Sequence, residues 1–191
     1  MKTESIACFA AALICIYPQM RIGIFTPRIN QAEVSIGRAT VFFQMNEDKI
    51  PHKIVKLTKQ KIELSNGSYM QAVSGSDQSN IEGLTFDIAV LDEAQKISNY
   101  TTSERILPML GGTNGKIIKI GTPKSRNHFY ESVEGKNSVD TVIIRSPWWQ
   151  CDQLSANGSI MLPDHTDPEH KRMRKYSTYV LNLMPKKIKM E

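Results

Sequence analysis

Cysteine is scarce in this chain of 191 residues, which contains three: Cys8, Cys15 and Cys151. The number is odd and the spacing fits no disulfide framework, so we expect free thiols in a reducing compartment. This pattern excludes the class of small secreted domains that depend on disulfides for their stability.

Long hydrophobic runs are missing as well. The most apolar stretch, residues 6–17, is too short to span a bilayer, which takes about 20 apolar residues in a helix. Glu4 precedes this stretch and no Ala-x-Ala cleavage pattern follows it, which disfavours a secretory signal. We therefore expect a buried helix here and no membrane partner.

The composition shows no extreme of charge. The formal net charge is +5, with 23% charged and 40% hydrophobic residues, as in an ordinary globular protein with a substantial core. A mildly basic balance permits a nucleic-acid partner without requiring one. Composition therefore leaves the function open, and motifs have to identify it.

The most informative stretch of the chain is Phe86–Gln95. Its apolar run over residues 88–91 is typical of a strand buried on both faces, and this run ends in Asp92 and Glu93. Adjacent carboxylates at the C-terminal tip of a buried strand suit a metal and water site. In that interpretation Asp92 holds Mg²⁺ and Glu93 polarises a water for attack on a γ-phosphate. The alternative is a solvated acidic turn.

The start of the chain carries a second signal. Lys2-Thr3 opens the predicted helix and matches the end of a P-loop, in which the lysine reaches the phosphates and the hydroxyl binds Mg²⁺. The glycine-rich part of that motif is not among the 191 residues, and Met1 occupies the position of its last glycine. An ordinary charged terminus is the alternative.

Two further strand ends are of interest. A strand predicted over residues 21–26 runs into Thr26-Pro27-Arg28, a segment similar to nucleic-acid-contacting loops of motor proteins. Another, over residues 116–120, ends in Gly121-Thr122-Pro123, where a small polar residue could sense the γ-phosphate. Simple turns are the alternatives for both. Between these strands we predict a helix over residues 30–44, antiparallel strands within residues 49–73, and a short helix over residues 103–110.

In this order and spacing, the segments resemble the ATPase domain of the large subunit of tailed-phage terminases, the DNA-packaging motor, over residues 2–150. The resemblance implies an α/β fold, a three-layer P-loop NTPase sheet of the RecA-like class with a catalytic glutamate and an additional strand, truncated at its N-terminus. Arg21–Thr26 is a candidate for the additional strand. Residues 151–191 would be an extension, or the start of a linker toward a nuclease domain.

The resemblance also implies roles for the motif residues. Lys2 and Thr3 would bind nucleotide, Asp92 and Thr3 would hold Mg²⁺, Glu93 would be catalytic, and Gly121, Thr122 and Pro123 would form the motif that couples hydrolysis to DNA movement. The implied cofactors are ATP and Mg²⁺. Many relatives carry Arg-Gly shortly before the acidic strand, and this chain has Glu82-Gly83 there, so the arginine finger remains unassigned.

The partners that the resemblance implies are double-stranded DNA, the terminase small subunit, the portal protein and further copies of the chain in a ring. The location would be the cytoplasm of an infected bacterium. Two alternatives stay open: the first RecA-like domain of a helicase, because Leu-Asp-Glu-Ala-Gln resembles the helicase Asp-Glu-Ala box, and a catalytically dead DNA-binding or assembly module. Without the phosphate-binding backbone of a P-loop, we expect these 191 residues alone to hydrolyse ATP poorly or not at all.

Overall fold

The structure is a computed structural model, and it describes residues 2–79, 81, 83–122, 126–133, 142 and 144. The chain divides into two compact units, residues 1–141 and residues 142–191. All the helices and strands described below lie in the first unit.

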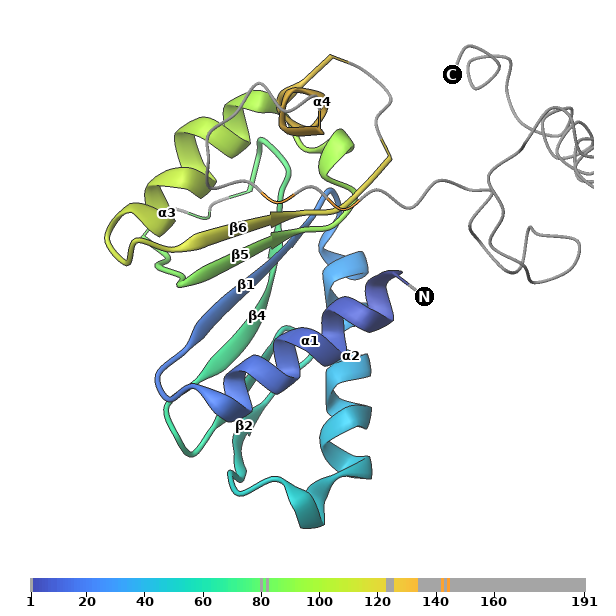
Figure 1. The fold of residues 1–191 in the computed structure, drawn as a ribbon, viewed down its shortest axis with the longest axis vertical. Coiled ribbons are helices and arrows are strands. Elements are labelled where there is room, and N and C mark those ends of the chain that lie inside the picture. The colour runs from blue at the N-terminus through green and yellow to red at the C-terminus, as the bar shows by residue number, and fades with distance from the viewer. Residues whose placement is uncertain are drawn as a thin grey trace, which may run out of the picture. The chain divides into compact units, whose positions relative to one another are not determined.

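The first unit alternates helices and strands along the chain (Figure 1). The elements are α1 (Lys2–Ile16), β1 (Arg21–Thr26), α2 (Ile29–Met45), η1 (Glu47–Lys49), β2 (Ile54–Leu57), β3 (Lys61–Leu64), β4 (Tyr69–Ser74), β5 (Ile88–Leu91), η2 (Ala94–Lys96), η3 (Thr101–Ile106), α3 (Leu107–Gly111), β6 (Lys116–Lys119) and α4 (His128–Val133).

The strands form one mixed six-stranded sheet in the order β2-β3-β4-β1-β5-β6. Neighbouring strands from β4 to β6 are parallel, whereas β2, β3 and β4 pair in antiparallel fashion. The register aligns Phe25 of β1 with Leu91 of β5, and Leu91 with Lys119 of β6. The C-terminal ends of β1, β5 and β6 therefore meet at one edge of the sheet, although long segments of chain separate them.

Each face of the sheet is covered by its own hydrophobic cluster. One cluster joins α1 and α2 to the sheet through residues such as Ile14, Ile24 and Ile36. The other packs the region of η3, α3 and α4 against the opposite face, with Phe25 and Phe86 at its centre. These two rings meet edge to face with their centroids 5.7 Å apart. Helices on both faces of a largely parallel sheet place ligand sites at the strand ends.

Most predicted elements are confirmed. Helix α2 buries the four residues that its periodicity selects, Ala32, Ile36, Ala39 and Phe43. The turn with Asn66-Gly67 joins β3 to β4 and places Gly67 at a φ of 81°, a backbone conformation that favours glycine. The run over residues 88–91 is a strand with three fully covered residues, as expected for the sheet interior.

One predicted helix differs in start and type. The expectation was an ordinary helix over residues 103–110, but η3 begins at Thr101 as a π-helix and α3 follows it. Pro108 lies in the first turn of α3 and has no N–H to give to the turn before it. The N–H of Leu107 instead reaches the carbonyl of Thr102, which is the wider spacing of a π-turn. Sequence periodicity does not distinguish the two helix types.

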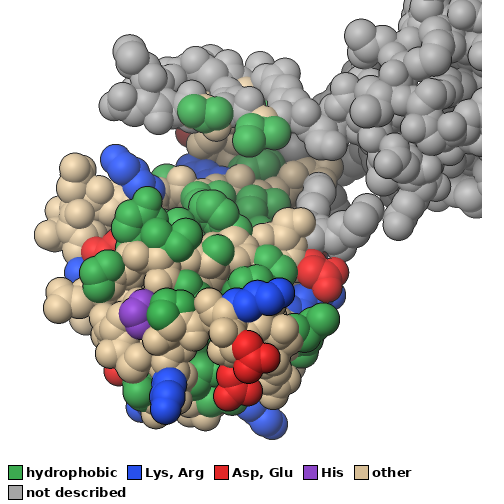
Figure 2. Space-filling model, turned by 60° about the horizontal axis from the view of Figure 1, so that its bottom comes forward, with side chains coloured by type: hydrophobic (Ala, Val, Ile, Leu, Met, Phe, Trp, Pro, Cys, Tyr) green, Lys and Arg blue, Asp and Glu red, His purple; other side chains and the backbone are tan. Residues whose placement is uncertain are grey.

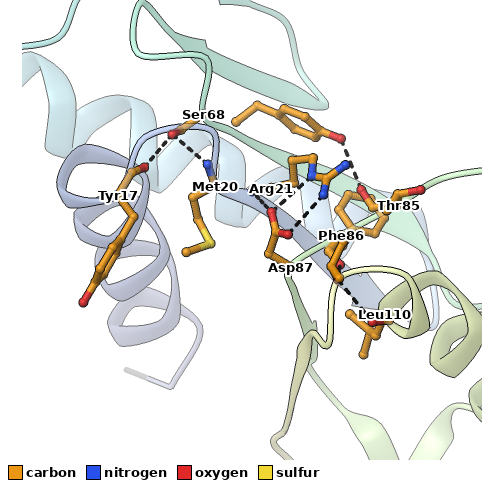
Figure 3. Close-up of polar contacts among 10 residues, drawn as sticks. Tyr17, Met20, Arg21, Ser68, Thr85, Phe86, Asp87 and Leu110 are labelled. Atoms are coloured by element: carbon orange, nitrogen blue, oxygen red, sulfur yellow. Dashed lines mark hydrogen bonds and ion pairs between the residues drawn. The ribbon is translucent and has the colours of Figure 1, made fainter.

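At the N-terminal end of the parallel strands, side-chain hydrogen bonds connect neighbouring segments (Figure 3). Asp87 accepts three: from the backbone N–H of Arg21 at 2.8 Å, and from its Nε and Nη2 at 3.1 Å each. Buried Ser68 donates to the carbonyl of Tyr17 and accepts from the N–H of Met20. These contacts tie the end of α1 and the starts of β1 and β5 together.

The face that Figure 2 brings forward is mixed in character. Figure 2 shows hydrophobic side chains beside acidic and basic ones, with neither sign of charge dominating this face. Val55 and Leu57 on the edge strand β2 are among the exposed hydrophobic residues. Over the described ranges, no helix combines the length and the apolar character that crossing a bilayer requires.

Candidate functional site

A pocket of about 330 Å³ opens at the C-terminal ends of β1, β5 and β6. The first turn of α1 and one side of α2 complete its wall. The lining residues are Thr3, Thr26, Gln31, Val34, Arg38, Asp92, Glu93, Gln95, Ile120, Gly121 and Thr122. Five residues to which the resemblance assigned a role thus share one pocket: Thr3, Asp92, Glu93, Gly121 and Thr122. Pro123 and the side chain of Lys2 lie outside the described residues.

Thr3 and Asp92 meet at the centre of this arrangement. The Thr3 hydroxyl donates to Asp92 Oδ2 at 3.1 Å, although 89 positions separate the two residues in the chain. Asp92 Oδ1 accepts the N–H of Glu93 at 3.0 Å, and the N–H of Asp92 continues the β1 ladder at the carbonyl of Phe25. The Asp92 carboxylate is therefore held in one orientation, with a hydroxyl oxygen beside it.

Glu93 follows in an unusual backbone conformation, with a φ of 54° and a ψ of 40°. This left-handed region is costly for a residue other than glycine, and it is enriched at functional sites. The Glu93 carboxylate forms an ion pair with Lys96 Nζ at 2.8 Å, and Gln31 Nε2 of α2 lies 3.5 Å from the same oxygen. The turn thus directs the second carboxylate toward α2 and away from the ladder.

The segment after Glu93 is tied to the end of β6. Ala94 donates its N–H to the carbonyl of Ile120 at 2.8 Å. Gln95 Oε1 accepts the N–H of Thr122 at 3.3 Å, and the Gln95 carbonyl accepts from Asn127 Nδ2 at 3.0 Å. The segment that follows Glu93 and residues 120–122 are therefore joined by direct hydrogen bonds.

Behind this link lies a half-buried basic pair, His128 and Lys119. His128 Nε2 lies 3.1 Å from the carbonyl of Ile97 and 3.2 Å from Thr102 Oγ1. Burial, and then the nearby Lys119, lower the pKa of His128. Burial also lowers the pKa of Lys119, whose Nζ donates to Ser132 Oγ at 2.9 Å. Both groups anchor α4 against the end of the sheet.

Sequence reasoning missed three pocket residues: Gln31, Arg38 and Gln95. Gln31 and Arg38 are seven positions apart in the predicted helix, so they share one helical face. That spacing was visible in the sequence, but the direction of the face was not. Gln95 follows Asp92 by three residues, and only the turned backbone at Glu93 brings it to Thr122.

The donor set of the pocket suits a hard divalent cation. A hydroxyl and a carboxylate oxygen are ligands that Mg²⁺ accepts, and Mg²⁺ normally keeps water and phosphate oxygens as its remaining ligands. Within the described ranges, no group of three or more His, Cys, Asp or Glu side chains could hold a metal. The residues present thus fit Mg²⁺ that arrives together with a phosphate, rather than a metal enclosed by protein ligands.

Comparison with known proteins gives a consistent answer. A protein-family model described as "Terminase large subunit, T4likevirus-type, N-terminal" matches residues 2–180. Two curated relatives are the large terminase subunits of Thermus phage G20c and Thermus virus P23-45, each 28% identical over 146 residues. Each alignment covers 68% of this chain and 30% of the relative, so the chain spans about a third of the length of these relatives.

Solved structures show the same similarity. The large terminase ATPase domain of Thermus phage P74-26 superposes with a TM-score of 0.62 at 26% identity, covering 69% of this chain and 59% of that one. The large terminase of bacteriophage HK97 superposes with a TM-score of 0.53 at 18% identity, covering 70% of this chain and 29% of that one, a similarity of fold.

Proposed function

This chain belongs to the family of T4-like terminase large subunits, and from that premise we propose that it supplies the ATP-hydrolysing core that drives viral DNA into a capsid. The family excludes the helicase alternative. The translocation of double-stranded DNA and the hydrolysis of ATP are both our proposals.

One observation carries the proposal: the hydrogen bond between Thr3 Oγ1 and Asp92 Oδ2. A hydroxyl at the start of a helix and a carboxylate at the tip of a buried strand are the pair that P-loop NTPases use to hold Mg²⁺. Neither residue is informative by its type alone. Their contact across the fold supports the assignment of Thr3 and Asp92 as Mg²⁺ ligands and of Lys2 as a phosphate-binding residue.

The chemistry we propose divides between the two carboxylates. Mg²⁺, when bound with ATP, neutralises charge on the β- and γ-phosphates. Asp92 and Thr3 would hold that ion, and Glu93 would accept a hydrogen bond from the attacking water and take up its proton. Lys96 and Gln31 both contact the Glu93 carboxylate and so fix its position at the pocket.

The coupling role that we propose for Gly121, Thr122 and Pro123 draws support from the link through Gln95. A change at Glu93 on hydrolysis displaces Gln95, and Gln95 contacts the N–H of Thr122. The backbone at Gly121 leaves space for that side chain. Residues 121–123 would then pass the nucleotide state to the DNA-contacting parts of the motor.

We also assign the finer fold class, a P-loop NTPase with an additional strand and a catalytic glutamate. The expectation placed Arg21–Thr26 between the two nucleotide-binding strands. Helices α1 and α2 pack on the same face, and β1 leads through α2 toward β4. Crossovers in parallel sheets are right-handed, so two crossovers on the same face step across the sheet in the same direction. A strand connected to β1 through α1 would therefore lie on the side of β1 away from β4, next to β6. That makes β6, rather than β1, our candidate for the additional strand.

The partners that we propose follow from family membership. They are double-stranded DNA, the small terminase subunit, the portal protein and a ring of identical subunits, in the cytoplasm of an infected bacterium. A catalytically dead assembly module is the remaining alternative, and nucleotide binding separates the two functions.

The test is a titration of the isotope-labelled chain with Mg²⁺ and ATP, followed by nuclear magnetic resonance, which detects weak binding. We expect saturable shifts at Thr3, Asp92 and Glu93 with millimolar affinity, and a clear loss of affinity in Asp92→Asn. Asp48→Asn, an exposed acid in η1, is the matched control. Affinity that is equal in all three proteins would remove the proposed site.

A further inference from the structure

Arg38 brings a positive charge to a pocket that otherwise presents carboxylates. It lies on α2 and lines the pocket together with Thr3, Asp92 and Glu93. Among the described lining residues it is the only cationic side chain. No role follows for it from the motifs, and it lies outside every segment that the sequence singled out as a site.

The guanidinium of Arg38 is incompletely paired. Its Nη1 is buried and makes no hydrogen bond within the described part of the chain. In the described part of the chain an ion pair joins Nη1 to Glu4 Oε2 at 3.5 Å, and the side chains of Arg38 and Glu4 are 38% and 63% exposed. Exposed pairs of this kind contribute roughly 0–1 kcal/mol. The Nη1 atom thus has only a long contact to an exposed carboxylate, and an anion that enters the pocket would give it a closer, charge-assisted partner.

Helix α2 positions this charge for a ligand. Gln31, Val34 and Arg38 follow each other at helical spacing and all line the pocket. Gln31 lies beside the Glu93 carboxylate at one end of this stripe. Arg38 lies two turns further along, facing Glu4 in the first turn of α1. The stripe therefore runs from the proposed water-activating carboxylate toward the start of α1.

We propose that Arg38 contacts a phosphate oxygen of the bound nucleotide, an inference that rests on the function proposed above. A guanidinium suits this task because its planar donors match two phosphate oxygens and its charge persists at every physiological pH. In the nucleotide-free chain Glu4 occupies part of this donor set. The phosphate displaces the Glu4 carboxylate, so Glu4 and the nucleotide compete for the Arg38 guanidinium.

The first experiment compares affinities for Mg²⁺-ATP by the same magnetic resonance titration. Arg38→Gln should bind about tenfold or more weakly, because a charge-assisted hydrogen bond is lost. Arg38→Lys keeps the charge without the planar donors, so its affinity should lie between those of the wild type and Arg38→Gln. Lys59→Gln removes an exposed positive charge between β2 and β3 that does not line the pocket, and its affinity should stay within about twofold of the wild type.

The second experiment tests the competition with Glu4. Glu4→Gln should tighten Mg²⁺-ATP binding by about two- to threefold, since the guanidinium is released. In the Arg38→Gln background the same substitution should change nothing. An equal gain in both backgrounds would reflect general repulsion between an acid and a phosphate, and would overturn the competition. Thermal unfolding of each variant verifies that α2 remains folded.

The outcomes separate the two proposals. If Arg38→Gln and Arg38→Lys bind as tightly as the wild type while Asp92→Asn binds weakly, the nucleotide site stands and the role of Arg38 falls. If the wild-type chain shows no saturable shift at all, the nucleotide site falls and the role of Arg38 with it. Should Arg38→Gln fail to fold, Arg38→Lys alone decides, through a loss of affinity or its absence.

Discussion

The side-chain oxygen of Gln95 occupies the space that a Cβ atom on Gly121 would need: the two would lie 2.0 Å apart. No real Cβ tolerates such an approach, so the close packing of these two residues depends on glycine. The same oxygen accepts the N–H of Thr122. The segment after β5 and the end of β6 therefore pack closely because the Gln95 side chain fills the space beside Gly121, which has no side chain of its own.

Gly121→Ala should displace Gln95 and break its bond to Thr122. Because Gln95 is flexible at its far end, we expect a loss of about 1 kcal/mol in the free energy of unfolding, measured by urea denaturation. Gln95→Ala in the same chain should recover part of that loss. Additive effects of the two substitutions would show that Gln95 and Gly121 are not coupled.

Replacement of Glu93 should reveal the cost of its backbone conformation. At a φ of 54°, glycine is unstrained and alanine is not, so Glu93→Gly should exceed Glu93→Ala in stability by roughly 0.5–1 kcal/mol. Both variants lose the ion pair to Lys96 equally. Chemical denaturation of the two proteins gives the comparison, and a more stable alanine variant would argue against left-handed strain.

Glu93→Gln should separate nucleotide binding from chemistry. The amide keeps the shape of the side chain but cannot accept a proton, so we expect Mg²⁺-ATP affinity within about twofold of the wild type. Asp92→Asn should lose affinity. If Glu93→Gln weakened binding as strongly as Asp92→Asn, the assignment of Glu93 to water activation alone would be wrong. Robust ATP turnover by the 191-residue chain that Glu93→Gln abolishes would contradict our expectation of weak activity.

The free energy of unfolding should fall as the pH drops from 6.5 toward the lowered pKa of His128. Its pKa is lowered in the folded protein from 6.5 by burial and by Lys119, so the unfolded chain binds the proton more readily. The contribution of neutral His128 is complete above pH 6.5 and is lost progressively as the pH falls toward its lowered value. Urea denaturation between pH 5 and pH 8 should show this slope.

His128→Gln should flatten that slope, because the titrating group is removed. His52→Gln, in the loop before β2, provides a matched control and should retain the slope of the wild type. A slope that survives His128→Gln would assign the effect to another group.

The Arg21–Asp87 pair should stabilise the fold. Burial alone would raise the pKa of Asp87, but the hydrogen bonds from Arg21 outweigh it and the net pKa is lowered. The contribution of this carboxylate is therefore present above the ordinary aspartate pKa and is lost as the pH falls through the lowered value. Asp87→Asn should cost about 1–3 kcal/mol in unfolding experiments at neutral pH. Asp48→Asn, at an exposed site, should stay within about 0.5 kcal/mol.

Local chemistry made much of the fold predictable. Periodicity identified α2 and its buried face, and Asn66-Gly67 identified the turn between β3 and β4. The tips of β5 and β6 followed from compact apolar runs that end in polar residues. The neighbours of each strand did not follow, because strand order depends on pairing between distant segments. The contacts of Arg38 and Gln95 were hidden for the same reason.

The pH-sensitive ion pair at Asp87 and the pocket at Asp92 lie at opposite ends of β5, a strand of four residues. Substitutions at Arg21, Ser68 or Asp87 should therefore change the thermal stability of this unit while leaving the nucleotide pocket untouched. Stabilising changes at active sites usually reduce activity. Here the length of β5 separates the residues that set thermal stability from those proposed to bind nucleotide, so each property can be changed without the other.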